Sequence, residues 1–212
     1  MILPPRPTEF IYPDQLSTFE RDGWWAQYKK NGQYNVIAVR GDRQLVYRNR
    51  HGEPHKNWQP SEALGNFFDF VLPDSQRHGD ENDWVFCTEL IEAKTPAVKG
   101  VTYIFDVLVA NSQSLVGKTF AERQMLLLET FAPMIDDASE SHYVLSKSSN
   151  SKVWLARNLK SNFRETWDAI SAPEDEGLVL KDPAAELASF YRANSNSWWQ
   201  VKCRKEHKNY EA

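Results

Sequence analysis

The sequence predicts an α+β protein whose β-sheets are antiparallel. Segments with the composition of strands dominate the chain, and they do not alternate regularly with helical segments as they would in a doubly wound fold. Eleven Phe, eight Tyr and eight Trp bring the aromatic content to 13%, which favours a β-containing globular protein over a disordered one. We find no internal repeat, and 212 residues suit one large or two small domains.

Residues 1–23 are expected to form an arm on the protein surface, because they are rich first in proline and then in polar side chains. Trp24 to Arg40 is aromatic and aliphatic on both sides of Asn31-Gly32, a pattern that predicts a β-hairpin. Lys29 and Lys30 directly precede this turn. An apolar strand lowers the pKa of a lysine from about 10.4, and a neutral amine is a nucleophile. Two solvated lysines near a turn are the structural alternative.

Five further segments have the aromatic and β-branched composition of strands and are bounded by turn-forming residues. They are residues 44–54, 84–93, 101–111, 176–183 and 198–205. Residues 94–100, rich in Lys, Pro and Gly, are expected to form the turn between the second and third of these strands. In the first segment, Arg48 and Arg50 are two residues apart and therefore share a face.

Three segments repeat apolar residues at helical spacing. They are residues 61–72, 120–134 and 151–170. Thr119 and Glu122 form a capping box that predicts where the second helix begins. In the third, apolar residues recur every four positions and are expected in the core: Leu155, Leu159, Phe163 and Trp167.

Charge and cysteine content narrow the class of protein. Against 29 Asp and Glu there are 25 Lys and Arg, so the net charge of -4 requires any nucleic-acid surface to be a local patch. Cys87 and Cys203 lack the spacing of a zinc site or a disulfide framework, which fits a reducing cytosol. The N-terminus has prolines where a signal peptide needs an apolar helix, and no segment approaches the ~20 apolar residues of a membrane span. We therefore expect a soluble, cytoplasmic protein with no membrane partner.

Four features then occur in order along the chain. They are Lys29 beside Asn-Gly, Arg50 before a Gly-Glu turn, Glu89 alone in an apolar strand, and Glu176 opening a strand that ends at Lys181. Each has a structural alternative when taken alone, because Arg50 can be a surface turn residue, Glu89 can face water and Glu176 can belong to a solvated acidic loop. Together they resemble the nucleotidyltransferase superfamily of ATP-dependent polynucleotide ligases and mRNA capping enzymes, and the ligase branch more closely.

The resemblance extends from about Trp24 to Lys205 and depends on six motifs in the family's order. They are Lys29-Lys30-Asn31-Gly32, Arg50-His51-Gly52-Glu53, Thr88-Glu89-Leu90, Ile104-Phe105-Asp106-Val107, Glu176-Gly177-Leu178-Val179-Leu180-Lys181 and Trp198-Trp199-Gln200-Val201-Lys202. Residues 111–127 are also similar to a ligase segment that joins a strand to a helix, including the Glu122-Arg123 pair.

This resemblance implies a nucleotidyltransferase domain over residues 24–205, with two antiparallel sheets, flanking helices and the nucleotide between the sheets. DNA ligases and capping enzymes generally continue into an OB domain, but we expect none here, because the sequence stops ten residues after Lys202. Residues 206–212 are expected to be a short polar tail. Catalytic roles are implied for Lys29, Arg50 and Lys202, nucleotide binding for Gln27, Glu89, Phe105, Lys181 and Lys202, and binding of Mg²⁺ or Mn²⁺ for Glu89 and Glu176.

The implied reaction begins with attack of the Lys29 amine on the α-phosphate of ATP, which leaves a covalent lysyl-AMP. AMP would then pass to a 5′-phosphate end of nicked DNA or RNA. Alternation along the strand places Gln27, Lys29 and Asn31 on one face and Lys30 on the other. With Lys29 in the pocket, Gln27 can reach the adenine edge, and Lys30 is not the nucleophile.

Three positions depart from the family pattern. Asn31 replaces the usual aspartate, Tyr34 stands where many ligases have an arginine, and Gln200 replaces the first lysine of the last motif. Each lost cation weakens binding of phosphate, so slow or conditional adenylylation is one expectation.

Two other functions stay open. One is a nucleotidyltransferase that caps or modifies another acceptor, and the other is a degenerate nucleotide-binding or nucleic-acid-binding module. The choice between DNA and RNA is also open, because the lack of an OB domain favours RNA whereas residues 111–127 favour DNA. We expect a monomer, with a helper protein as one possible source of the nucleic-acid platform.

Overall fold

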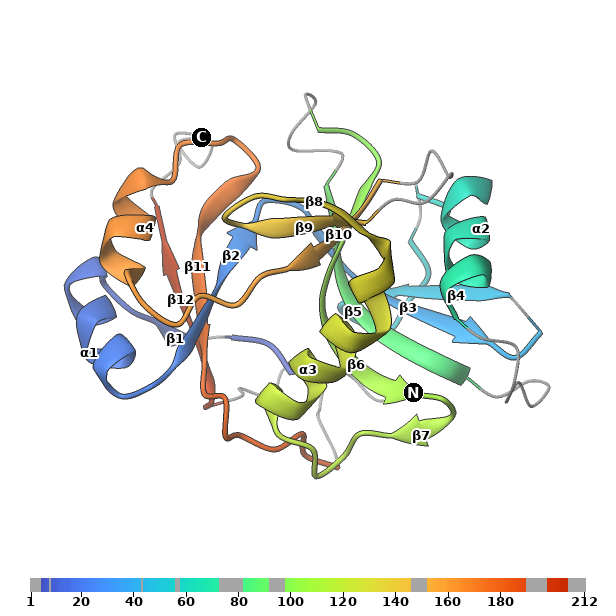
Figure 1. Ribbon diagram of the computed structural model, residues 1–212, viewed down its shortest axis with the longest axis horizontal. Coiled ribbons are helices and arrows are strands. Elements are labelled where there is room, and N and C mark those ends of the chain that lie inside the picture. The colour runs from blue at the N-terminus through green and yellow to red at the C-terminus, as the bar shows by residue number, and fades with distance from the viewer. Residues whose placement is uncertain are drawn as a thin grey trace.

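The computed structural model describes residues 5–7, 9–42, 44–55, 58–72, 82–91, 98–145, 152–189 and 198–205, and it contains two β-sheets with helices on their outer faces (Figure 1). The helices are α1 (Leu16–Arg21), α2 (Glu62–Val71), α3 (Phe120–Phe131) and α4 (Phe163–Ala169). The strands are β1 (Glu9–Phe10), β2 (Trp25–Lys30), β3 (Gln33–Arg40), β4 (Leu45–Asn49), β5 (Asn82–Ile91), β6 (Val101–Ala110), β7 (Gln113–Ser114), β8 (Ile135–Ala138), β9 (His142–Leu145), β10 (Lys152–Ala156), β11 (Asp175–Lys181) and β12 (Gln200–Arg204). The turn predicted at residues 94–100 lies largely outside the described residues, as does the tail at 206–212.

The smaller sheet has the strand order β1-β12-β11-β2, and the larger sheet has the order β4-β3-β5-β6-β10-β9-β8, with β7 beside β6. The predicted α+β class is therefore confirmed. The prediction that the sheets are wholly antiparallel is wrong in two places, because β1 pairs with β12 and β6 pairs with β10 in parallel. Parallel neighbours need a long connection, and the chain between β6 and β10 supplies one that contains α3 and the β8–β9 hairpin.

The predicted hairpin at Asn31-Gly32 is wrong, because the two strands beside it belong to different sheets. Strand β2 pairs with β11, whereas β3 pairs with β4 and β5. Gly32 is not part of a hairpin turn but allows the chain to pass close to β5. A Cβ atom at this position would lie 2.4 Å from the carbonyl oxygen of Leu90 and 2.8 Å from Cγ of Glu89. The residue is glycine because the chain passes tightly against β5 as it crosses between the sheets.

Two of the three predicted helices are confirmed. Ser61 caps α2 by accepting a hydrogen bond from the Leu64 backbone N–H at 3.2 Å, and Thr119 and Glu122 form the capping box of α3. Both helices begin with a local hydrogen-bonding signal, which sequence reading detects directly.

The third predicted helix, residues 151–170, is wrong over most of its length. Residues 152–156 form strand β10 between β6 and β9, and only residues 163–169 are helical. A spacing of four residues is a multiple of two, so Leu155 and Leu159 share a face in a strand as well as in a helix. Asn162, with a left-handed backbone (φ 61°), separates the two elements.

Each sheet buries one face in its own hydrophobic core. The larger core lies between the larger sheet and helices α2 and α3, and the smaller core lies between the smaller sheet and helices α1 and α4. Within the smaller sheet, Leu178 and Leu180 of β11 point into the core. The alternate residues Val179 and Lys181 therefore point into the space between the sheets, where they line a pocket.

The N-terminal segment is joined to this arrangement at two points. Strand β1 is the edge of the smaller sheet, and the carboxylate of Glu20 accepts hydrogen bonds from the backbone N–H groups of Asn162 and Phe163 at 3.0 and 2.9 Å. These bonds satisfy donors at the start of α4, whose Asn162 makes no side-chain cap. The domain boundary at residue 24 stays a prediction. Among the described residues, no helix combines the length and apolar character that a membrane crossing needs.

Candidate functional site

A pocket of about 790 Å³ lies between the two sheets. It collects all eight residues that the sequence motifs predict for the site, which are Gln27, Lys29, Arg50, Glu89, Phe105, Glu176, Lys181 and Lys202. Strands β2, β11 and β12 form one wall, and β3, β5 and β6 form the other. Residues up to 175 positions apart in the sequence therefore meet in one cavity, while their chemical roles stay predictions.

Lys29 and Glu176 form an ion pair between β2 and β11. Lys29 Nζ contacts Glu176 Oε1, and the same oxygen accepts a hydrogen bond from Arg204 Nη2 at 3.2 Å. The side chain of Glu176 is 6% exposed and that of Lys29 is 17% exposed. Because the Glu176 carboxylate pairs with both Lys29 and Arg204, it fixes the position of the Lys29 amine in the pocket.

Lys30 has a separate environment, in agreement with alternation along β2. Its Nζ lies 2.6 Å from Asp175 Oδ1 and donates to Ser141 Oγ at 3.2 Å. Its side chain is 1% exposed and lies over the rings of Tyr28, Tyr103 and Trp154. Burial raises the pKa of Asp175, which the charge of Lys30 opposes. The Lys30 amine is thus part of the packed wall of the site.

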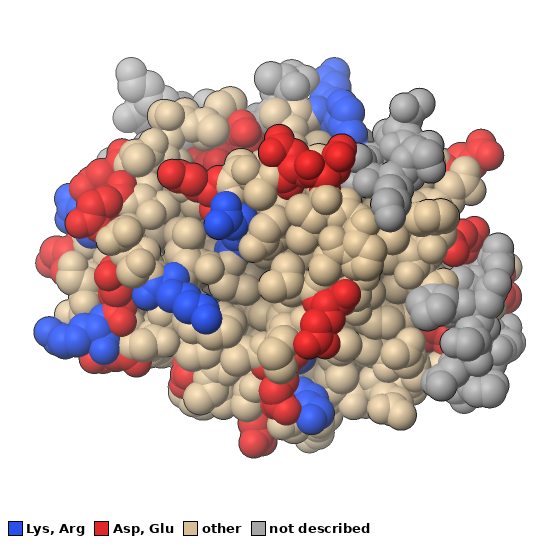
Figure 2. Space-filling model, viewed as in Figure 1, with Lys and Arg blue, Asp and Glu red and all other residues tan. Residues whose placement is uncertain are grey.

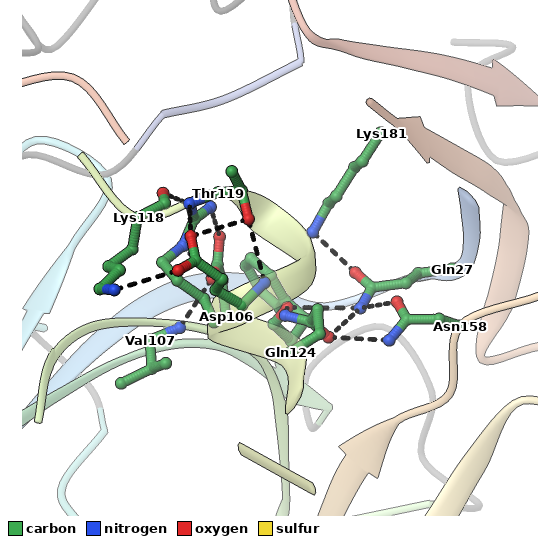
Figure 3. A network of polar contacts seen from close by, with 11 residues as sticks. Gln27, Asp106, Val107, Lys118, Thr119, Gln124, Asn158 and Lys181 are labelled. Atoms are coloured by element: carbon green, nitrogen blue, oxygen red, sulfur yellow. Dashed lines mark hydrogen bonds and ion pairs between the residues drawn. The ribbon is translucent and has the colours of Figure 1, made fainter. Parts of the chain in front are cut away.

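Gln27 and Lys181 form a buried polar network at the aromatic end of the pocket (Figure 3). Lys181 Nζ donates to Gln27 Oε1 at 2.6 Å, and Gln27 Nε2 donates to Gln124 Oε1 and Asn158 Oδ1 at 2.9 Å. Gln124 in turn donates to the Phe105 carbonyl oxygen at 3.1 Å. Since protein groups already satisfy the Gln27 amide, reading of an adenine edge by Gln27 would require this network to rearrange.

Gln124 and Asn158 belong to this network although none of the six sequence motifs includes them. Gln124 lies on α3, and Asn158 lies in the loop after β10. Gln124 is only 5% exposed, and a buried amide needs hydrogen-bond partners. This requirement becomes visible only when the burial of the residue is known.

Lys181 belongs to the aromatic end of the pocket and not to the cluster of cations around Lys29. Its Nζ lies 5.0 Å from the ring centroid of Phe105 and 4.6 Å from that of Phe120. Burial lowers the pKa of Lys181 to about 8. Tyr34, which replaces the arginine of the family pattern, packs edge-on against Phe105 at 5.8 Å. This departure therefore adds an aromatic wall in place of a cation.

Lys202 lies at the opposite, cationic end of the pocket. Its Nζ donates to the Pro7 carbonyl oxygen at 3.1 Å and lies 4.1 Å from the ring centroid of Phe10. Burial lowers the pKa of Lys202 to about 8, and the nearby charges of Arg204 and Lys29 add to this effect. Arg50 is exposed at the rim, where its Nε donates to His51 Nε2 at 3.0 Å.

Basic groups are concentrated in the pocket and not on the face seen in Figure 2. That face, over α3, α4 and the β8–β9 hairpin, mixes acidic and basic side chains and shows no continuous basic surface where residues are described. A local patch was the sequence expectation for a protein of net charge -4.

Glu89 and Glu176 are the carboxylates that could hold a divalent cation, and they come from opposite sheets. The described part of the chain contains no group of three or more His, Cys, Asp or Glu side chains placed to bind a metal. Two carboxylates nevertheless suit Mg²⁺, which commonly takes one or two carboxylates and completes its shell with phosphate oxygens and water.

Gly177, next to Glu176, is expected to tolerate no side chain. Its φ is +134°, and a Cβ would lie 2.1 Å from the carbonyl oxygen of Cys203 and 2.9 Å from Cα of Arg204. We expect Gly177→Ala to lower the free energy of unfolding by more than about 2 kcal/mol, because the β11–β12 register must shift. Chemical denaturation measures this change.

Gly65→Ala is the matched control for this prediction. Gly65 lies in α2 with nothing within 4 Å of the added Cβ, so the same substitution should raise stability by roughly 0.5–1 kcal/mol. Equal free energies of unfolding for Gly177→Ala and Gly65→Ala would show that the close approach of Cys203 to Gly177 does not destabilise the Gly177→Ala variant.

Comparison with known proteins identifies one family and several similar folds. The family described as "ATP dependent DNA ligase domain" matches residues 75–202. DNA ligase 4 of Yarrowia lipolytica is 32% identical over 106 residues, which are 49% of this chain and 10% of that protein. This chain thus spans about a tenth of the length of that curated relative.

Two solved structures show the same fold. A mycobacterial DNA ligase D complexed with ATP and MES superposes with a TM-score of 0.61 at 14% identity, over 95% of this chain and 60% of that chain. A structure from a study of Lig E DNA ligases has a TM-score of 0.55 at 14% identity, over 96% of this chain and 70% of that chain. Both likenesses extend over nearly the whole chain and therefore include both sheets.

Proposed function

Because this chain belongs to the family of ATP-dependent DNA ligase domains, we propose that it catalyses adenylylation in a polynucleotide ligase, with Lys29 as the nucleophile. The observation that carries the proposal is the convergence of Lys29, Glu176 and Arg204 at one end of the pocket that Phe105 lines. An amine, a carboxylate that orients it, cations for phosphate and an aromatic face for a base are the groups that this chemistry needs.

In the first step, the Lys29 amine, once it has given up its ammonium proton, attacks the α-phosphorus of ATP. A nitrogen–phosphorus bond forms as the bond to the bridging oxygen breaks, pyrophosphate leaves with that electron pair, and the nitrogen releases a proton to solvent. Glu176 orients the amine, and the charges of Lys202 and Arg204 stabilise the negative charge that develops on the phosphate oxygens. Mg²⁺ or Mn²⁺ would add to this stabilisation, with Glu89 and Glu176 as the residues that would hold it.

In the later steps, AMP passes from Lys29 to a nucleic-acid end. An oxygen of the 5′-phosphate attacks the phosphorus of lysyl-AMP, the nitrogen–phosphorus bond breaks, and the nitrogen takes up a proton, which restores the lysine amine. A neighbouring 3′-hydroxyl then attacks the activated 5′-phosphate, loses its proton and releases AMP. The family match favours DNA as the strand that is joined.

A nucleotide-binding module without covalent chemistry is the second candidate. Gln200, which is 3% exposed, lines the pocket at a position where the motif has a lysine. An amide in place of an ammonium group weakens stabilisation of the charge on phosphate.

Labelling separates these candidates. The full chain is incubated with Mg²⁺ and α-³²P-labelled ATP or GTP, and we expect an acid-labile, lysine-linked label from ATP. Binding of ATP with no label would support the binding module. The labelled protein is then given DNA nicks, RNA nicks and single strands with 5′-phosphates. Sealed nicked DNA is the expected product, and label transfer to another acceptor without sealing would contradict the ligase proposal.

A further inference from the structure

The N-terminal arm forms part of the pocket wall at its cationic end. Pro5, Arg6 and Pro7 all line the cavity. The arm is held there by β12, because β1 pairs in parallel with β12 and the Ile11 backbone N–H donates to the Lys202 carbonyl oxygen at 3.0 Å. The wall beside Lys202 therefore comes from a segment that precedes every motif in the sequence.

The same end of the pocket concentrates positive charge. Lys29, Arg6, Lys202 and Arg204 line it together, and Glu176 accepts contacts from two of them. The lowered pKa of Lys202 has burial as its main cause, followed by the positive charges of Arg204, Lys29 and Arg6. Arg6 is thus within electrostatic reach of the amine that the motif assigns to phosphate binding. A polyanion bound here would relieve the repulsion among these cations.

The hydrogen bond between the arm and Lys202 does not occupy all the donors of the Lys202 ammonium group. An ammonium group has three donors, and Lys202 uses one of them on the Pro7 carbonyl oxygen. A phosphate can therefore bind Lys202 while the arm stays in place. The planar guanidinium group of an arginine beside that site matches phosphate oxygens in a bidentate manner.

We propose that Arg6 is a phosphate-binding residue of this pocket and that it contacts the β- and γ-phosphates of the nucleotide, beside Lys202. The inference deepens the proposed function and depends on it for the identity of the nucleotide. The triphosphate tail is favoured over a strand end because Arg6 lines the same cavity as Phe105 and Lys29. Arg6 adds a cation beside Lys202 in a pocket where Gln200 is neutral.

Calorimetric titration of the full chain tests this assignment with three probes, which are ATP, AMP and inorganic pyrophosphate, each with Mg²⁺. We expect Arg6→Ala to weaken ATP and pyrophosphate binding about ten-fold or more, as loss of a charge-assisted contact does, and to change AMP binding less than about two-fold. Arg6→Lys should recover part of the loss. Arg21→Ala is the control, because Arg21 is an exposed arginine on α1 whose side chain is 75% exposed.

Two results would overturn the assignment. One is unchanged pyrophosphate affinity in Arg6→Ala, and the other is an equal loss of AMP and ATP affinity, which would indicate a general distortion of the pocket. A fourth probe, a nicked duplex with a 5′-phosphate, distinguishes the other source of phosphate. Weaker binding of this duplex with pyrophosphate binding intact would place Arg6 at the strand end and contradict the proposal.

Failure of this inference is separable from failure of the proposed function. Pyrophosphate binding is measured without covalent chemistry, so it reports on Arg6 even if wild-type protein forms no adduct with ATP. Conversely, wild-type protein and Arg6→Ala could both form the adduct at the same ATP concentrations. This result would support the proposed function and contradict the role of Arg6.

Discussion

Lys29→Ala is expected to abolish formation of the covalent protein–AMP adduct, whereas Lys30→Ala should still form it. The two residues are adjacent, but Lys29 Nζ contacts Glu176 in the pocket, and Lys30 Nζ is paired with Asp175 and Ser141. Alanine at position 29 has no amine that could attack ATP, so the radioactive label on the protein should fall below detection. Incubation with α-³²P-labelled ATP followed by denaturing electrophoresis measures the adduct.

The pair of variants is its own matched control. Lys30→Ala leaves Asp175 buried without its cation, so we expect a loss of stability of about 3 kcal/mol with labelling retained. Lys29→Ala should change stability less, because its partner Glu176 keeps Arg204. Labelling of Lys29→Ala together with loss of labelling in Lys30→Ala would reverse the assignment of the nucleophile.

Arg123→Ala is expected to cause the largest loss of stability, about 3–5 kcal/mol. Arg123 Nε and Nη2 donate to the two carboxylate oxygens of Asp106 at 2.9 Å, and Nη1 donates to the Lys118 carbonyl oxygen at 2.9 Å. Arg123 is 1% exposed, and its guanidinium group lies over the rings of Phe120 and Trp199. Removal of the Arg123 side chain leaves the buried Asp106 carboxylate between α3 and β6 without its cation. Urea denaturation measures the loss.

A surface pair in the same protein provides the control. Arg164 Nε and Asp168 Oδ2 are also 2.9 Å apart, but both side chains are about half exposed (46% and 53%). Arg164→Ala should therefore cost no more than about 0.5 kcal/mol, because solvent screens the pair. A loss below about 1 kcal/mol in Arg123→Ala would show that water or another group replaces the guanidinium group.

Residues that line the pocket could be named from the sequence because the resemblance restricts the residue type at each motif. Lys29, Arg50, Glu89, Glu176 and Lys202 stand near glycines or in apolar strands, where a charged side chain is unusual, and all five line one pocket. Their number and order carried the inference. Gln124, Asn158 and Arg6 could not be found in this way, because a polar residue in a helix, a loop or a proline-rich arm is ordinary until its burial or neighbours are known.

By itself, the sequence determined the α+β class, helices α2 and α3, and eight of the residues that meet in the pocket. These properties depend on local signals: caps, periodicity of two or about four, and motif chemistry. Tertiary structure alone decided that Asn31-Gly32 joins two sheets, that residues 152–156 are a strand, and that the N-terminal arm lines the pocket beside Lys202. The reason is that a strand is stabilised by hydrogen bonds to partners far away in the chain, so its pairing and the faces it exposes are fixed only when those partners are in place.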